Sequence, residues 1–231
     1  MTYENSKTIV TRLVKKGWLL RLTPGKYLII PLEAGINSNY SEHGFVIASH
    51  LVTPYYIGYL SALNYHGLTD RVPAVIYIAT TLRRRDRTIL YNRYKFVTIV
   101  NKKMFGYTNT KISDTEIKIS DPEKTIIDCL DHPEYSGGFE EIAKTLYYEH
   151  KKLDTNKLIN YAKKQGNKTI LKRLGFLFET YKTKDSLNHL KGLTLSEGYS
   201  KLDPTRPNTG HYNNKWGLIE NIDLEKWDWI K

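Results

Sequence analysis

The start of the chain combines an amphipathic segment with two short strand-like stretches, and this order constrains the fold more than any other feature. When residues 6–16 are plotted at about 100° per residue, apolar side chains share one side and polar or cationic side chains share the other. Gly17 follows, where a helix can end in a left-handed cap. Residues 18–23 and 26–30 are typical of strands and are joined across a Pro-Gly pair, a strong turn signal. The sequence therefore predicts a helix followed by a two-stranded hairpin.

This order of helix and hairpin is typical of a winged helix-turn-helix that faces DNA. A helix that reads DNA needs short polar and cationic side chains that reach base edges and phosphates, while its opposite face anchors in a core. The candidates on the helix are Lys7, Thr8, Thr11, Arg12, Lys15 and Lys16, and those on the hairpin are Arg21 and Lys26. Glu4 is the only acid in this part of the chain. A solvated basic face explains the same pattern, so both interpretations are open at this point.

The composition favours an anionic partner in a reducing compartment. The 231 residues include 35 Lys and Arg against 24 Asp and Glu, and a net charge of +11 favours polyanions such as nucleic acid. Cys129 is the single cysteine, which excludes an internal disulfide and indicates a cytoplasmic location. No apolar run approaches the roughly 20 residues of a membrane span, and the N-terminus has no signal-peptide core. We therefore expect no association with a membrane.

A larger region of mixed helices and strands follows an expected linker at 33–40. The predicted helices cover 41–52, 54–68, 122–132, 139–151, 155–165 and 168–182, and the predicted strands cover 74–80, 94–100 and 116–120. Asp121, before a proline, and Asp154 are placed to cap two of these helices. The predicted fold class is α+β, with a truncated winged-helix-like unit at 1–35 and a larger mixed α/β domain at 36–231.

A strongly basic segment separates two of the predicted strands. It contains Arg83, Arg84, Arg85, Arg87 and Arg93, followed by lysines, with Asp86 as the only acid among them. The guanidinium fork suits phosphate better than the lysine ammonium does, so the segment predicts contacts to nucleic-acid phosphates. The alternative is an exposed loop whose charges contact only water. A second functional alternative is an RNA-binding module in which these arginines and exposed tyrosines contact the ligand.

Signatures of catalysis are weak. Asp86, Glu116 and Lys118 loosely match the arrangement of metal-dependent nucleases, in which two carboxylates hold a metal and a lysine assists the attacking water. The outer face of an alternating strand explains Glu116 and Lys118 equally well. One cysteine cannot build a zinc site, and Cys129 lies among apolar residues, where a buried inert thiol is the default. The sequence therefore predicts no enzyme, no metal site and no cofactor.

Five phrases in this order resemble one known family. They are RLVKKGWLLRLTPGKYLI, YYIGYLSALNYHGLTD, ISDPEKTIIDCLDHPEYSGG, KRLGFLFE and LDPTRPNTGHYNNKWGL. Together they span nearly the whole chain and resemble the AbiEi family, the antitoxins and transcriptional regulators of type IV toxin–antitoxin and abortive-infection systems. The run DPEKTIIDCLD with the glycine pair at 137–138 is the most specific part.

The resemblance implies an N-terminal winged helix that binds operator DNA and represses its own operon, and a larger C-terminal domain needed for antitoxicity. The genetic partner of such an antitoxin is a nucleotidyltransferase-like toxin, and a type IV antitoxin is not expected to form a stable complex with it. Carried over to this sequence, the DNA-reading elements are the helix around Thr8 to Lys16 and the hairpin around Arg21 to Lys26. The SALNYHGL and DPEKTIID phrases are expected to be fold signatures.

The sequence departs from the family at its start. The family's winged helix begins with two further helices, and two helices of about ten residues each do not fit before Thr8. Those helices normally cover the apolar side of the next helix, here Ile9, Val10, Leu13 and Val14. Exposing these side chains to water would lose several kcal/mol of stabilisation, because burial of apolar surface contributes about 25 cal/mol per Å². We therefore expect the C-terminal domain or a second subunit to cover it, in a monomer or a homodimer.

Overall fold

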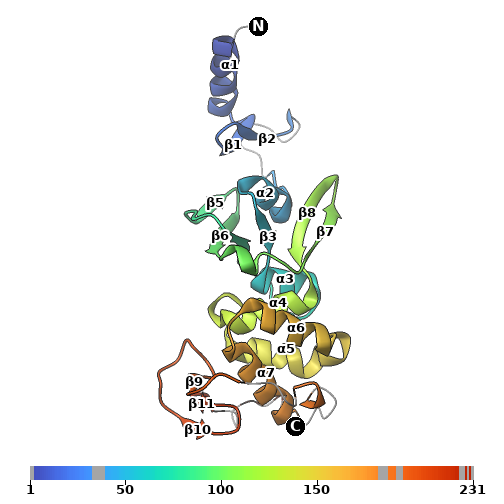
Figure 1. The fold of residues 1–231 in the computed structure, drawn as a ribbon. Coiled ribbons are helices and arrows are strands. Elements are labelled where there is room, and N and C mark those ends of the chain that lie inside the picture. The colour runs from blue at the N-terminus through green and yellow to red at the C-terminus, as the bar shows by residue number, and fades with distance from the viewer. Residues whose placement is uncertain are drawn as a thin grey trace.

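The computed structural model describes residues 3–32, 40–181, 187–190, 195–223, 227 and 229. It has the predicted α+β fold. From top to bottom, Figure 1 shows the N-terminal helix and hairpin, a six-stranded sheet, a layer of helices and a small second sheet. The predicted linker falls almost entirely on residues 33–39, outside the described part of the chain.

The N-terminal helix, α1 (Tyr3–Lys15), ends as the sequence predicts. Gly17 has a φ of 76°, a left-handed conformation that glycine adopts without a steric penalty. Its N–H donates to the carbonyl of Val14 at 3.0 Å, and the N–H of Trp18 donates to the carbonyl of Leu13 at 3.0 Å. These bonds satisfy carbonyl groups that the end of a helix leaves without partners.

The predicted hairpin is also present. β1 (Leu19–Thr23) and β2 (Lys26–Ile29) pair antiparallel around a turn in which Gly25 has a φ of 78°. Leu22 on β1 is 2% exposed and belongs to an apolar cluster that includes side chains of α2 (Gly44–Leu51). The hairpin is therefore packed on the main body through α2.

The apolar side of α1 is only partly covered by the rest of the chain. Ile9 is 40% exposed and Val14 is 36% exposed, while Val10 and Leu13 are half-buried. Figure 1 shows α1 standing clear of the main body, with the hairpin between them. The expectation that the C-terminal domain covers this surface is wrong for the described residues, because the hairpin makes the contact to the body. Coverage by a second subunit stays a prediction.

Six strands form the central sheet in the order β5-β6-β4-β3-β8-β7. Their bounds are β3 (Tyr55–Ile57), β4 (Val75–Thr80), β5 (Arg87–Ile89), β6 (Asn92–Thr98), β7 (Tyr107–Ile112) and β8 (Thr115–Ser120). β4 pairs with β6, and β3 with β8, in parallel, whereas the other neighbours are antiparallel. The three predicted strands correspond to β4, β6 and β8.

The helix predicted for 54–68 is wrong in its first half. Tyr55–Ile57 forms β3, and α3 (Tyr59–Tyr65) begins after it. β3 is buried between β4 and β8, and a short apolar run buried on both faces has no periodicity that separates a strand from a helix. Sequence reasoning also misses β5 and β7, the two edge strands, because their exposed polar residues resemble loops.

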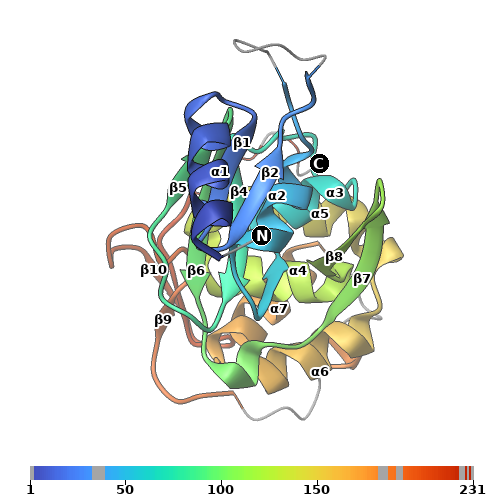
Figure 2. The same ribbon diagram turned by 90° about the horizontal axis from the view of Figure 1, so that it is seen from above.

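Apolar side chains cover both faces of the sheet. On one face α2 packs in a cluster that contains Ile47, Ile57 and Tyr94. On the other face α3 and α4 pack in a cluster that contains Tyr56 and Ile126. Figure 2, seen from above, shows α2 over the sheet on the side that carries the hairpin.

The remaining helices lie close to their predicted bounds. They are α4 (Pro122–Asp131), α5 (Phe139–Glu149), α6 (Thr155–Gln165) and α7 (Thr169–Thr180), with short 3₁₀ helices η2 (Asn101–Lys103), η3 (Pro133–Tyr135) and η4 (His150–Lys152). Asp121 accepts from the N–H of Lys124 at 2.9 Å, and Asp154 accepts from the N–H of Lys157 at 3.1 Å, so both predicted caps are confirmed. Among the helices described, none is long and apolar enough to cross a membrane.

The small second sheet is attached to α7. Its strands are β9 (Ser200–Lys201), β10 (His211–Asn213) and β11 (Leu218–Glu220). The ammonium of Lys172 donates to the carbonyl of Gly198 at 2.6 Å, and the guanidinium of Arg173 donates to the carbonyl of Lys201 at 3.0 Å. The ammonium of Lys172 also donates to the carbonyl of Gly217 at 3.2 Å, so two phrases of the family resemblance, KRLGFLFE and LDPTRPNTGHYNNKWGL, are in direct contact.

Candidate nucleic-acid interface

The predicted DNA-reading side of α1 faces solvent. The six candidates Lys7, Thr8, Thr11, Arg12, Lys15 and Lys16 are all exposed. Local contacts occur among them: the hydroxyl of Thr11 donates to the carbonyl of Lys7 at 2.8 Å, and the ammonium of Lys16 lies 5.1 Å from the centre of the Trp18 ring. These contacts leave the cationic groups of Arg12 and Lys15 accessible.

The two candidates on the hairpin differ in their surroundings. Arg21 is exposed in the middle of β1. Lys26, beside the turn, is exposed as well, and its ammonium donates to the carbonyl of His50 at 3.4 Å. His50 lies in the last turn of α2, where carbonyl groups attract cations. Lys26 therefore leans toward the main body.

The hairpin turn and the arginine-rich segment meet around one hollow. This hollow has a volume of about 560 Å³ and is lined by Lys26, by His50, and by Arg84, Arg85 and Arg87 of the segment before β5. We call these residues the hairpin–arginine surface. The sequence presents the two basic groups as separate, and packing of the hairpin on α2 brings them together.

Arg87 is exposed and also has a partner within the chain. Its guanidinium donates a hydrogen bond to the backbone carbonyl of Leu22 on β1. Arg83, Arg84 and Arg85 are exposed, and no described carboxylate lies within 4.0 Å of their guanidinium groups. These three stay candidates for phosphate contacts, as does Arg87 through the rest of its guanidinium.

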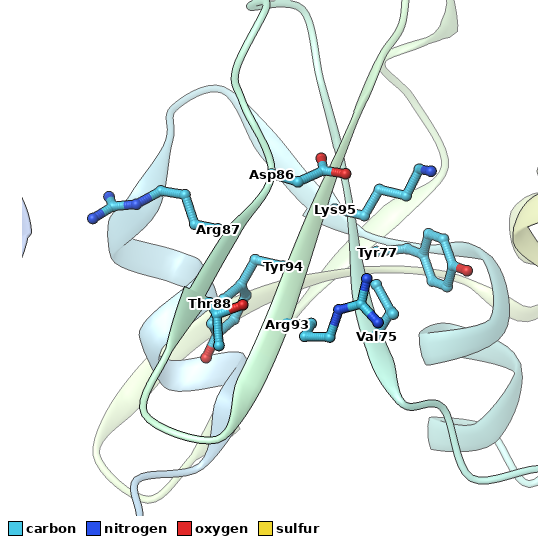
Figure 3. A pocket seen from close by; sticks show the side chains of 8 residues that line it. All are labelled: Val75, Tyr77, Asp86, Arg87, Thr88, Arg93, Tyr94 and Lys95. Carbon is cyan, nitrogen blue, oxygen red and sulfur yellow. The ribbon is translucent and has the colours of Figure 1, made fainter.

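Arg93 does not line the hollow of the hairpin–arginine surface, but Arg87 lines both that hollow and the one that contains Arg93. Arg93 lies on β6 and lines this second hollow of about 240 Å³ together with Lys95 and Tyr77, a site that sequence reasoning misses. Figure 3 shows Arg93 on the same side of the strands as Tyr77, whereas the guanidinium of Arg87 points away from them. One run of basic sequence therefore supplies two surfaces.

The fold does not bring Asp86 together with Glu116 and Lys118, as a nuclease site would require. Asp86 immediately precedes β5, and Glu116 and Lys118 lie on β8, with β6, β4 and β3 between them in the sheet. At a strand spacing of about 4.8 Å, β5 and β8 are roughly 19 Å apart. Asp86 instead accepts from the N–H of Phe96 at 3.1 Å. Within the described ranges, no cluster of three His, Cys, Asp or Glu side chains could hold a metal ion.

The DPEKTIID phrase forms a buried polar network. The ammonium of Lys124, which is fully buried, donates to Asp128 at 2.5 Å and to Gln165 at 3.0 Å. The hydroxyl of Tyr56 donates to the other oxygen of Asp128 at 2.7 Å. Burial raises the pKa of the neighbouring Cys129 thiol well above its ordinary value. These residues join β3, α4 and α6, which agrees with a role in the fold.

One known protein family matches a large part of this chain. The family model of the AbiEi antitoxin C-terminal domain matches residues 56–180, more than half of the chain. The chain belongs to the AbiEi antitoxin family. The matched residues begin at Tyr56 in β3 and include the whole of α4 to α7.

A solved structure shares the fold of this AbiEi family member. It is the crystal structure of the RV2827C protein from Mycobacterium tuberculosis, with a TM-score of 0.61 and 12% sequence identity, and the match covers 92% of this chain and 78% of that one. A search of curated proteins finds no match. At this identity the likeness concerns the fold alone.

Proposed function

We propose that this protein is the antitoxin of a type IV toxin–antitoxin system and represses its own operon by binding operator DNA. The observation that carries the DNA-binding part is the hairpin–arginine surface, where Lys26, Arg84 and Arg85 line one hollow. α1 presents Arg12 and Lys15 at the same end of the molecule. Membership of an antitoxin family supports the antitoxin part.

Contacts to bases and contacts to phosphates are made by different elements. Side chains of α1 have the reach and the chemistry for base edges in a major groove, where donors and acceptors identify each base pair. The arginine-rich segment and the hairpin turn have the chemistry for phosphates, which fix the position of a protein on the duplex without reading its sequence. Arg12 therefore contributes to sequence preference, and Arg84 contributes to affinity for any duplex.

The proposal extends to the rest of the protein. Residues 1–35 form the DNA-reading unit, the helix and hairpin of a winged helix, and residues 36–231 form the antitoxin domain, in a cytoplasmic monomer or homodimer. The protein opposes a nucleotidyltransferase-like toxin without forming a stable complex with it. It acts through binding, with no enzymatic activity and no cofactor.

Electrophoretic mobility shifts at several salt concentrations test the DNA-binding part, with a duplex from upstream of the gene and an unrelated duplex. Arg12→Ala should weaken operator binding and reduce the preference for the operator. Arg84→Ala should weaken both duplexes alike and lower the slope of log K against log salt by about 0.9 for each phosphate that the protein no longer neutralises. Lys111→Ala, which removes an exposed lysine on β7 at the far edge of the sheet, should change neither. Unchanged midpoints for both arginine variants at low salt would refute binding by these elements.

Co-expression tests the antitoxin part. The chain should restore growth to bacteria that express the adjacent nucleotidyltransferase-like gene. Arg12→Ala should still restore growth from an inducible promoter, because antitoxicity is assigned to residues 36–231. Failure of the unmodified chain to restore growth would remove the antitoxin assignment and leave the DNA-binding result untouched.

A further inference from the structure

The hollow beside β4 and β6 contains Tyr77, Arg93 and Lys95, to which the proposed operator binding assigns no role. Its volume is about 240 Å³, and its lining includes Tyr77, Asp86, Thr88, Arg93 and Lys95. Residues two apart on a strand point to the same face, so Arg93 and Lys95 project together from β6. Lys95 lies directly opposite Tyr77 of β4 in the parallel register.

The hollow is positive. Asp86 is the one acid in its lining, and an oxygen of that carboxylate already accepts from the N–H of Phe96 at 3.1 Å. In the part of the chain that the structure describes, neither Arg93 nor Lys95 has a carboxylate within 4.0 Å. Two cations that lie side by side and are not engaged in an ion pair with a described carboxylate are suited to a phosphate group.

The Tyr77 ring lines the hollow and is held by neighbouring aromatic rings. The Tyr77 ring lies 5.7 Å from the ring of Tyr135 in η3, and both rings pack against the buried Tyr59, at 6.1 Å and 5.3 Å. The ammonium of Lys95 lies 5.2 Å from the centre of the Tyr135 ring. These contacts fix the Tyr77 ring, which is half-buried, beside the guanidinium of Arg93.

This hollow and the hairpin–arginine surface share Arg87. Arg93 and Lys95, however, face away from the hairpin. Tyr94, between Arg93 and Lys95 on β6, points to the opposite face of the sheet and is buried in the cluster with α2. The hairpin packs on that opposite face through Leu22. A duplex bound to α1 and the hairpin therefore leaves Arg93 and Lys95 free for another ligand.

We propose that this hollow binds one nucleoside phosphate unit, with its phosphate between Arg93 and Lys95 and its base against the Tyr77 ring. A fixed ring beside two cations is the combination that binds unpaired nucleotides, because bases within a duplex are stacked and do not present their faces. The volume is below the roughly 300–1,000 Å³ of sites that enclose a whole small ligand, which suits a single unit. The unit comes from a free nucleotide or from an unpaired residue of a strand.

Fluorescence anisotropy of a labelled twelve-residue oligouridylate, with a duplex of the same length in parallel, tests the proposal on the full chain. Arg93→Gln with Lys95→Gln should raise the Kd for the oligouridylate at least tenfold and change the Kd for the duplex less than threefold. Arg84→Gln with Arg85→Gln removes the same charge from the other surface and should give the reverse pattern. Equal losses for the two double variants, or no binding of oligouridylate by the unmodified chain, would overturn the proposal.

Two further measurements identify the contacts and the source of the unit. Tyr77→Leu should raise the Kd for the oligouridylate about fivefold or more, the range expected for loss of one stacked base, whereas Tyr77→Phe keeps the ring and should bind like the unmodified chain. Equal binding by Tyr77→Leu and the unmodified chain would overturn the stacking contact. Competition by uridine monophosphate at a concentration within tenfold of the oligouridylate Kd would assign a free nucleotide, and a need for much higher concentrations would assign a strand. Neither result depends on whether the operator is bound.

Discussion

The guanidinium of Arg87 donates a hydrogen bond to the carbonyl of Leu22, across 65 positions of sequence. The side chain of the same Leu22 is buried in the cluster with α2. One residue of the hairpin is thus held through its side chain by the core and through its backbone by the arginine-rich segment. The orientation of the hairpin therefore depends on the main body, and so does the position of any DNA that the hairpin contacts.

Arg87→Ala should loosen the hairpin without unfolding the protein. A hydrogen bond to a charged donor contributes about 1.5–3 kcal/mol, so the amides of β1 and β2 should exchange with deuterium roughly 10–100 times faster, while the amides of β4 and β6 keep their rates. Hydrogen exchange measured by mass spectrometry reads both sets. Arg85→Ala, which removes an exposed guanidinium from the same segment, is the control. Equal exchange of the hairpin in the two variants would contradict the anchoring role of Arg87.

The features that could be predicted from the sequence are those whose interacting residues lie close together along the chain. Asp121 and Asp154 cap helices because their partners are three residues away, and Gly17 ends α1 for a reason contained in its own backbone. The bond from Arg87 to Leu22 depends on how the hairpin packs on α2, which no local pattern reports. For the same reason, the sequence could supply a list of basic residues but could not divide them between two faces of a sheet.

Lys124 and Asp128 should be far more important to stability than an exposed ion pair of similar geometry. Both side chains are buried, with exposures of 0% and 1%. Lys124→Met would leave the Asp128 carboxylate buried without its cation, a change that lowers the free energy of unfolding by about 3–5 kcal/mol. Lys152→Met breaks the pair with Glu149, in which the lysine is 69% exposed, and should lower it by about 1 kcal/mol or less. Urea denaturation compares the two variants, and similar losses would contradict the prediction.

Gly175 allows α7 to approach the small C-terminal sheet. A Cβ atom at this position would lie 2.0 Å from Cζ3 of Trp216, whose indole N–H donates to Glu179 at 2.5 Å. Gly175→Ala should therefore lower the free energy of unfolding by about 1–3 kcal/mol, even though alanine favours helices. Trp216→Leu in the same chain removes the clash and should recover part of this loss. Thermal unfolding measures both, and a Gly175→Ala variant as stable as the unmodified chain would show that Trp216 moves aside freely.

The acid limit of stability should depend on Asp131. Burial raises the pKa of this carboxyl, but hydrogen bonds from Lys103, Asn167 and Gln165 outweigh burial and lower the pKa below its ordinary value of 3.8. Lys103 donates to it at 2.6 Å. A carboxyl whose pKa is lower in the folded than in the unfolded chain stabilises the fold above the unfolded value and loses this effect as the pH falls through the folded value.

Asp131→Asn should therefore flatten the loss of stability below about pH 4, because the asparagine binds no proton in either state. The variant should also be less stable than the unmodified chain near pH 7, where Lys103 loses its anionic partner. Urea midpoints measured from neutral pH to below pH 3 give both quantities, and Glu197→Gln, which removes an exposed carboxylate, is the control. An unchanged acid limb in Asp131→Asn would mean that the hydrogen bonds from Lys103, Asn167 and Gln165 do not hold this carboxyl ionised in the folded protein.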